Sequence, residues 1–281
     1  MFPASRAVRK ELAPVVTSGG VAKPIIQVLI EEAVDAGIPE IAIVVQPQDK
    51  PLFEAFFKTP VAADQFSRLP PRLQSEARLL ETLGRRITFL VQERPEGFGH
   101  AVGVAREWVG PEPFLLALGD HLYRSDAPAS CVAQLLAACE ACPSSLVGLA
   151  ATPPEEVSNF GAVGAAPAES PGRFRITEFV EKPDRAYAES KLRVEGFPGR
   201  YLCLFGLYAL RPAVFVHLQR LCDEGLRAAG EFQLTAALES MRRDEGCMGL
   251  VIQGRRYDTG RPGEYVKALA ALANGSVTGA P

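Results

Sequence analysis

The sequence predicts an α/β fold, built on a Rossmann-like sheet that is mixed but mainly parallel and is flanked by helices. Segments with strand and helix character alternate up to residue 152, the order that parallel and mixed sheets require. After Pro153 the chain is richer in turn residues, which predicts an antiparallel elaboration of the same unit. Neither a repeat nor a linker divides the 281 residues, so we expect a single domain over residues 1–281.

In the first half, helices are predicted where apolar residues recur every three or four positions, and strands where short runs are wholly apolar. Residues 24–37 fit a helix that Gly37 ends, and Pro128 suits the first turn of a helix over 128–141. The helical region 52–86 is expected in two pieces, because Pro70 and Pro71 interrupt it. The other expected elements are a helix at 100–109 and strands at 41–45, 87–92, 113–120 and 145–152.

In the second half, two short strands around the turn-rich segment 167–172 predict an antiparallel hairpin, over 161–164 and 175–180. Two further strands are expected, at 201–210 and 247–252. Two helices are expected, at 232–243 and 264–273, the second stopped by Asn274-Gly275.

Charge and composition exclude several classes of protein. With 30 basic and 33 acidic residues the net charge is −3, which gives no electrostatic reason to bind nucleic acid or an anionic membrane. No apolar stretch is long enough to span a bilayer, and the first residues have no signal-peptide character. The six cysteines fit a reduced compartment. We therefore expect a cytoplasmic protein.

The residues with chemical potential are aspartates, a lysine and glycines near strand ends. Asp120 ends an apolar strand and Asp258 follows another, so both could lie at the carboxyl edge of a parallel sheet and share a divalent cation. The alternative interpretation of either aspartate alone is a turn or helix cap. Lys182 ends a strand in Glu181-Lys-Pro; alone it fits a solvated strand end, and beside an aspartate pair it is a candidate phosphate ligand.

Familiar hydrolase and nucleotide-binding motifs are missing from the sequence. Neither a nucleophile elbow, a zinc-binding His pair nor a phosphate-binding loop with Lys followed by Ser or Thr occurs. Gly97-Phe-Gly99 lies between a strand and a helix, where the backbone can approach a ligand closely, but it lacks the third glycine of the dinucleotide fingerprint. By itself this glycine pair is therefore a weak signal.

Seven motifs, in this order, resemble those of the sugar-1-phosphate nucleotidyltransferases. They are Lys23-Pro-Ile-Ile, Gly97-Phe-Gly-His-Ala-Val, Leu118-Gly-Asp120, Val157-Ser-Asn-Phe-Gly-Ala-Val163, Glu181-Lys-Pro183, Gly230-Glu-Phe-Gln-Leu-Thr235 and Tyr257-Asp-Thr-Gly260. The resemblance covers residues 1 to about 273. The second, fourth and sixth motifs look most like those of the members that make UDP-glucose and pyrophosphate from UTP and glucose 1-phosphate. The implied fold is that of the nucleotide-diphospho-sugar transferases.

The resemblance also implies roles for individual residues. Residues 1–152 would mainly bind the nucleotide, with Gln92 and Gly97 facing the uracil, and residues 153–281 would mainly bind the sugar phosphate. By this resemblance, Asp120 and Asp258 would hold Mg²⁺ between the two substrates, and Lys10 would offset charge on the triphosphate. Lys182 would grip the sugar phosphate, and Glu181 with the backbone of Gly161 would bind glucose hydroxyls. Such folds often pair through their helices, so a homo-oligomer is expected.

The chain departs from this family pattern, most of all at its start. The family has an apolar strand and a Gly-x-Gly-Thr-Arg loop before the position of Met1, and that loop cradles the triphosphate. We expect either a start placed inside the true gene or a truncated, catalytically silent paralogue that binds sugar nucleotide. A third reading keeps the chemistry with dTTP or another sugar phosphate. Smaller departures are Arg9 in place of Pro, a longer turn over 17–22, and Ala236 in place of an acidic residue.

Overall fold

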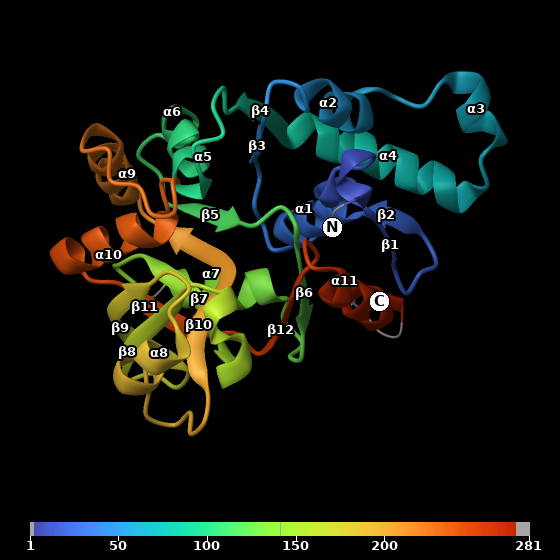
Figure 1. Ribbon diagram of the computed structural model, residues 1–281. Helices are drawn as coiled ribbons and strands as arrows, with labels where there is room; N and C mark the ends of the chain where they lie inside the picture. Colours follow the sequence, from blue (N-terminus) through green and yellow to red (C-terminus); the bar gives the residue numbers. More distant parts are fainter. Residues whose placement is uncertain (1–2, 141, 274–281) are drawn as a thin grey trace.

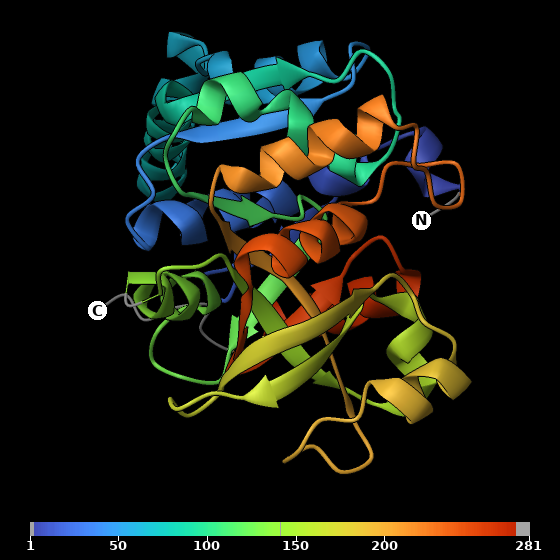
Figure 2. The ribbon, with the colours of Figure 1, turned by 90° about the vertical axis from the view of Figure 1, so that its left-hand side faces the viewer.

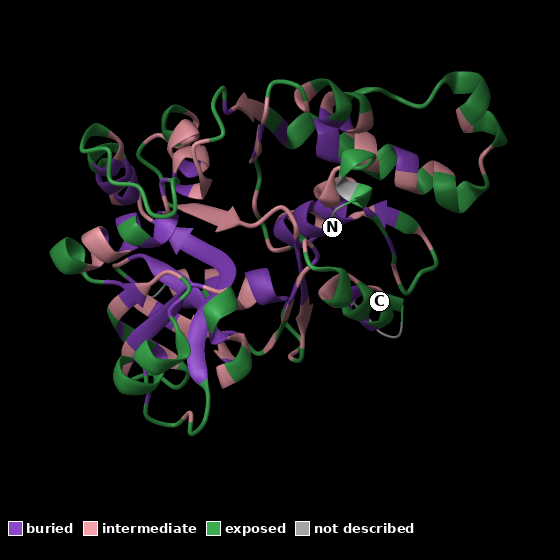
Figure 3. Cartoon of the chain, viewed as in Figure 1, coloured by how far each residue is buried: buried purple, intermediate pink, exposed green. Residues whose placement is uncertain are grey.

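The largest sheet of the protein has six strands. The computed structural model describes residues 3–140 and 142–273. Within them the sheet has the order β5 (Phe114–Ala117), β10 (Tyr201–Leu210), β7 (Leu146–Thr152), β11 (Met248–Val251), β9 (Arg173–Val180), β8 (Ala162–Pro167). The strands β8 and β9 form the antiparallel hairpin that the sequence predicts. All ten residues of β10 are buried, because this strand is paired on both sides, with β5 and with β7, and is covered on both faces (Figures 1 and 3).

Three smaller strand pairs complete the described β-structure. They are β1 (Pro14–Val16) with β2 (Ala22–Pro24), β3 (Ile41–Val45) with β4 (Ile87–Val91), and β6 (His121–Ser125) with β12 (Gly254–Asp258). The mixed sheet with flanking helices is confirmed, but the expectation of mainly parallel strands is wrong for the described residues. Only β3–β4 and β7–β11 are parallel there. A wholly apolar run indicates that a strand is buried on both faces, but it does not indicate the direction of the strand. The prediction of parallel strands from such runs therefore failed.

The helices follow the predicted pattern with several corrections. Their bounds are α1 (Ile25–Asp35), α2 (Lys50–Lys58), α3 (Ala63–Arg68), α4 (Pro71–Arg86), α5 (Phe98–Val104), α6 (Arg106–Val109), α7 (Cys131–Glu140), α8 (Arg185–Lys191), α9 (Ala213–Asp223), α10 (Leu234–Glu245) and α11 (Pro262–Ala273). The short 3₁₀ helices are η1 (Ala4–Arg6), η2 (Lys10–Leu12) and η3 (Pro154–Asn159). Residues 52–86 belong to three helices and not two, because Pro60 holds Thr59 out of the helical region. The helix expected at 100–109 is divided at Ala105, and the expected stop at 274–275 lies outside the described residues.

Helices cover both faces of the six-stranded sheet. On one face α9 and α10 pack against it, with Phe215, Leu218 and Leu238 in a core shared with the strands (Figure 2). On the other face α7 contributes Leu135, which packs in a cluster with Phe205 of β10. None of the helices in the described ranges combines the length and apolar character needed to cross a bilayer.

Several of the described strands are paired on one side only, and β3 and β5 are two of them. β3 pairs only with β4, and β5 pairs only with β10. The four residues of β5 are apolar, yet each is only partly buried.

Candidate functional site

Asp120 and Asp258 converge on one small space, although by another route than the sequence suggests. Asp120 lies in the turn between β5 and β6, and Asp258 ends β12, where it is paired with His121 in an antiparallel ladder. The expected carboxyl edge of parallel strands is therefore wrong for this pair. A Cβ atom on Gly260 would stand 3.0 Å from Oδ1 of Asp258 and 3.3 Å from Oδ2 of Asp120. Both carboxylates thus reach the same point.

The turn around these aspartates is fixed by hydrogen bonds. The amide of Thr259 donates to the carbonyl of Asp120 over 3.0 Å, and its hydroxyl donates to the same carbonyl over 2.5 Å. The amide of Gly260 donates to Oδ1 of Asp258 over 3.0 Å. Because backbone and side chain are both held, the two carboxylates are positioned before any ligand arrives.

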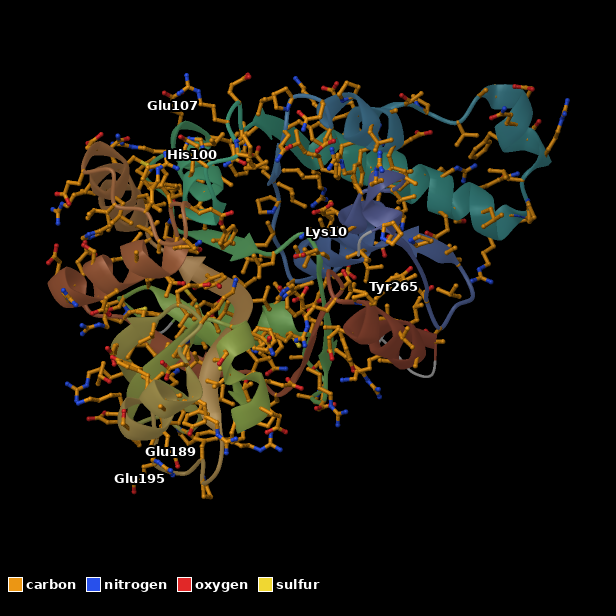
Figure 4. The ribbon with its side chains drawn as sticks, viewed as in Figure 1. Lys10, His100, Glu107, Glu189, Glu195 and Tyr265 are labelled. Carbon is orange, nitrogen blue, oxygen red and sulfur yellow. The ribbon has the colours of Figure 1, made fainter. Side chains whose placement is uncertain are left out.

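Lys10 supplies the positive charge of this cluster. From η2, its Nζ lies 2.6 Å from Oδ2 of Asp120, and the lysine is labelled near the centre of the view in Figure 4. Burial alone would lower the pKa of Lys10, but the carboxylates of Asp120 and, more weakly, Asp258 outweigh burial and raise it. The lysine therefore stays charged beside the aspartates.

The two carboxylates fit a divalent cation that takes its other ligands from a substrate. Magnesium is commonly held by one or two carboxylates together with phosphate oxygens, and less often by an all-protein cage. In the described part of the chain no group of three or more His, Cys, Asp or Glu could hold a metal. Asp120 and Asp258 alone would leave most positions of the ion open for phosphate and water.

A second cluster joins Gly161, Glu181 and Lys182. The hydroxyl of Thr235 donates to Oε2 of Glu181 over 2.5 Å. A Cβ atom at Gly161 would stand 3.4 Å from that oxygen and 2.7 Å from Cδ1 of Leu204, so a side chain here would clash with Leu204. Lys182 has φ of +44°, uncommon for a residue with a side chain, and its exposed ammonium lies 3.8 Å from Oε1 of Glu181.

A third cluster contains Gln92 and Gly97. Gln92 directly follows β4. Its backbone amide donates to the carbonyl of Val45 over 2.8 Å, which extends the ladder with β3. Its side-chain Nε2 donates to the carbonyl of Gly97 over 3.2 Å and lies 2.9 Å from Nδ1 of His100. Gly97 has φ of +113°, and a Cβ there would stand 2.8 Å from the carbonyl oxygen of Phe232.

Two segments connect the three clusters. On β10, the amide of Leu204 donates to Gly161, and the carbonyl of Gly206 accepts from Leu118, two residues before Asp120. These two points are two residues apart along β10. Residues 232–235 connect the second cluster to the third. The carbonyl of Phe232 accepts from Gly99, beside the third cluster, over 2.8 Å, and Thr235 contacts Glu181 of the second.

Sequence reasoning assigned no catalytic or substrate-binding role to three residues that the structure places around these clusters. His100 contacts Gln92, Thr235 contacts Glu181, and Arg227 reaches Oε1 of Glu96 over 2.7 Å. His100 and Thr235 lie within the quoted motifs. The motifs therefore indicated their positions but not their contacts. Arg227 and Glu96 are 131 positions apart, and no local pattern could have joined them.

Comparisons with known proteins show what the chain is similar to. The family described as nucleotidyl transferase matches residues 1–275. A UTP–glucose-1-phosphate uridylyltransferase of Bacillus subtilis is 32% identical over 277 residues, which cover 97% of this chain and 86% of that protein. A second such enzyme, from Staphylococcus saprophyticus, is 32% identical over 280 residues, covering 97% and 87%.

Solved structures agree as well. A crystal structure of UDP-glucose pyrophosphorylase complexed with UDP-glucose superposes with a TM-score of 0.77 at 26% identity and covers 96% of this chain and 92% of that one. The resemblance drawn from the seven sequence motifs is thereby confirmed. Family match, identity over nearly the whole chain and a shared fold lead to one conclusion: the chain belongs to the nucleotidyl transferase family.

Proposed function

We propose that this protein transfers a uridylyl group from UTP to glucose 1-phosphate, which forms UDP-glucose and releases pyrophosphate. The observation that carries the proposal is the convergence of Asp120 and Asp258 beside Lys10. Two carboxylates and a lysine fit a reaction between phosphates, in which negative charge must be neutralised and no protein nucleophile is needed. The curated relatives with this activity support the choice of substrates.

The reaction is an in-line displacement. A phosphate oxygen of glucose 1-phosphate forms a bond to the α-phosphorus of UTP, and the bond to the β-phosphate oxygen breaks, so that pyrophosphate leaves with the electron pair. A Mg²⁺ ion held by Asp120 and Asp258 would neutralise charge on the reacting phosphates. Lys10 would hold the triphosphate from the side of Asp120, and Lys182 would hold the phosphate of the sugar.

The other two clusters would bind the remaining parts of the substrates. Glu181, whose Oε2 already accepts from Thr235, has a second oxygen to accept from a glucose hydroxyl. Gly161 lies against Glu181, so its backbone would meet the sugar that Glu181 binds. Gln92 and the loop at Gly97 would meet the uracil.

Formation of UDP-glucose and pyrophosphate from UTP and glucose 1-phosphate, with and without Mg²⁺, tests the proposal directly. In Asp258→Asn the amide oxygen keeps the hydrogen bond from Gly260 while the charge is lost, so we expect turnover to fall by roughly 10²–10³-fold with the fold intact. Asp126→Asn is the control, because Asp126 is exposed at the end of β6 and pairs only loosely with Arg255, 3.9 Å away. An active Asp258→Asn protein would refute the metal assignment.

The same assay separates the two alternative functions. A thymidylyl transferase would use dTTP in preference to UTP, which competition between the two nucleotides measures. A silent paralogue would bind UDP-glucose tightly and release no pyrophosphate from UTP.

A further inference from the structure

The side-chain amide of Gln92 has one defined orientation. Its Nε2 lies 3.2 Å from the carbonyl oxygen of Gly97, and a backbone carbonyl can only accept a hydrogen bond. The amide atom that faces this carbonyl must therefore be the NH₂ group and not the oxygen. The same NH₂ group lies 2.9 Å from Nδ1 of His100, so Nδ1 accepts and the imidazole carries its proton on Nε2.

The surroundings of His100 favour the same tautomer. Its Nε2 lies 3.6 Å from Oε2 of Glu96. Arg227 donates to Oε1 of Glu96 over 2.7 Å, and this hydrogen bond lowers the pKa of the glutamate, which keeps it ionised. A carboxylate beside Nε2 stabilises a proton on that nitrogen and leaves the lone pair on Nδ1 for Gln92.

Arg227 is itself held in place. Its guanidinium lies over the ring of Phe232, 4.0 Å from the ring centroid. The amide of Phe232 donates to the carbonyl of Glu96 over 2.9 Å. The loop before α5 is therefore fixed by both side-chain and backbone bonds to the segment that precedes α10.

This arrangement leaves the oxygen of Gln92 free. Gln92 is only 8% exposed, and no donor among the described residues reaches its Oε1. The oxygen is not one of the fully enclosed atoms without a partner, so it keeps some exposed surface. A largely buried amide that offers only an acceptor selects a ligand with a donor at that place.

The free oxygen distinguishes pyrimidine bases. Uracil and thymine carry an imide N–H at position 3, whereas cytosine has a lone pair there. An N–H would donate to the oxygen of Gln92, while a lone pair would leave two acceptors facing each other. We propose that His100 is a positioning residue that holds the amide of Gln92 with its oxygen outward and thereby selects uracil and thymine nucleotides over cytosine nucleotides. The inference rests on the proposed placement of the base at Gln92 and Gly97.

Two substitutions of His100 test the inference. His100→Asn places an amide oxygen close to the position of Nδ1 and keeps an acceptor for Gln92, whereas His100→Leu removes it. The histidine side chain is 26% exposed, so both variants are expected to fold, which thermal unfolding checks. Calorimetric titration of the full chain with UTP and with CTP measures the ratio of the two dissociation constants. We expect His100→Leu to weaken UTP binding about tenfold and to lower the preference for UTP by the same factor.

The outcomes distinguish the inference from the proposed function. His100→Asn is expected to keep the preference to within about threefold. If His100→Leu kept the parental preference for UTP over CTP, the inference would be overturned. The same holds if His100→Asn lost as much of this preference as His100→Leu does. A parent protein that does not prefer UTP over CTP would instead refute the proposed base site. Arg227→Met provides an independent variant. Without the hydrogen bond from Arg227 to Glu96, the preference for UTP over CTP is expected to fall. An unchanged preference would contradict the part that Glu96 plays in orienting His100.

Discussion

Lys10 and Asp120 form an ion pair of 2.6 Å between η2 and the turn before β6, two elements 110 positions apart. The carboxylate that we propose as a metal ligand therefore already holds a cation, which the chain itself provides. The lysine side chain is 43% exposed, so it can leave the aspartate for a phosphate without unpacking a core.

Removing the charge of Lys10 should affect activity far more than stability. For Lys10→Met we expect uridylyl transfer to fall by roughly 10²-fold, because the triphosphate loses a cation, while the free energy of unfolding changes by less than about 1 kcal/mol. Arg9→Met is the matched control. Its ion pair with Asp49 is 2.5 Å long and its side chain is 40% exposed, but it lies outside the proposed site. Equal losses in turnover for both variants would contradict the assigned role.

Two glycines on α5 should respond to alanine in opposite directions. A Cβ at Gly99 would stand 2.8 Å from the carbonyl oxygen of Phe232, so we expect Gly99→Ala to lower the free energy of unfolding by about 1–3 kcal/mol. At Gly103 nothing lies within 4 Å, and Gly103→Ala should stabilise the protein by about 0.5–1 kcal/mol. Urea unfolding of the two variants checks both signs, and a neutral Gly99→Ala would show that the contact yields easily.

Glu32 should make stability depend on pH. Burial raises its pKa from 4.5 to about 7, although the backbone amides of Val132 and Cys131 at the start of α7 act in the opposite direction. Because folding raises this pKa, protonated Glu32 contributes fully to the free energy of unfolding below pH 4.5. This contribution is lost as the pH rises to 7. The loss amounts to about 3 kcal/mol.

The variant Glu32→Gln cannot ionise and should escape this loss. Relative to the parent, its free energy of unfolding is expected to rise between pH 5 and pH 8. Chemical denaturation at both values measures the difference, and a difference that is the same at both would contradict the assignment.

Arg256 illustrates a charged group that costs stability. Its guanidinium lies 3.8 Å from the centroid of Phe160, and its Nε and Nη1 are enclosed without a partner. Burial lowers the pKa of this arginine. Arg256→Met keeps the contact with Phe160 and removes the desolvated charge, so the free energy of unfolding should rise by about 1 kcal/mol.

Activity gives a second measurement for the same variant. Methionine packs on Phe160 without the cation–π attraction of the guanidinium. Because Phe160 precedes Gly161, the KM for glucose 1-phosphate is expected to rise more than kcat falls. The exposed Arg255, 71% accessible, provides the neutral control Arg255→Met. A clear fall in stability of Arg256→Met would show that the enclosed atoms have polar partners in solution.

Local pattern predicted the parts of the fold that burial alone determines. The run of apolar residues over 201–210 became β10, and the periodic spacing over 24–37 became α1. The strands β6 and β12 escaped prediction because both are short and partly polar, and each is defined by pairing with the other across more than 120 positions. Helix α9 was also missed, although Val214, Phe215 and Leu218 have helical spacing and the signal was present.

The site was predictable residue by residue only through family resemblance. Periodicity could propose Asp120 and Asp258 as a pair, but it could not know that an antiparallel ladder would bring them together. The orientation of Gln92 depends on His100, eight positions away, and on a carbonyl, so it follows from side-chain geometry that no motif contains.

The segment 232–235 supports two loops. The carbonyl of Phe232 accepts from Gly99 in the first turn of α5, directly after the loop of Gly97, while Thr235 holds Glu181. If base and sugar bind where we propose, neither loop can shift without moving the segment that supports the other. The two substrates would then bind with a coupling free energy, and linkage requires that UTP changes the affinity for glucose 1-phosphate by the same factor as glucose 1-phosphate changes the affinity for UTP.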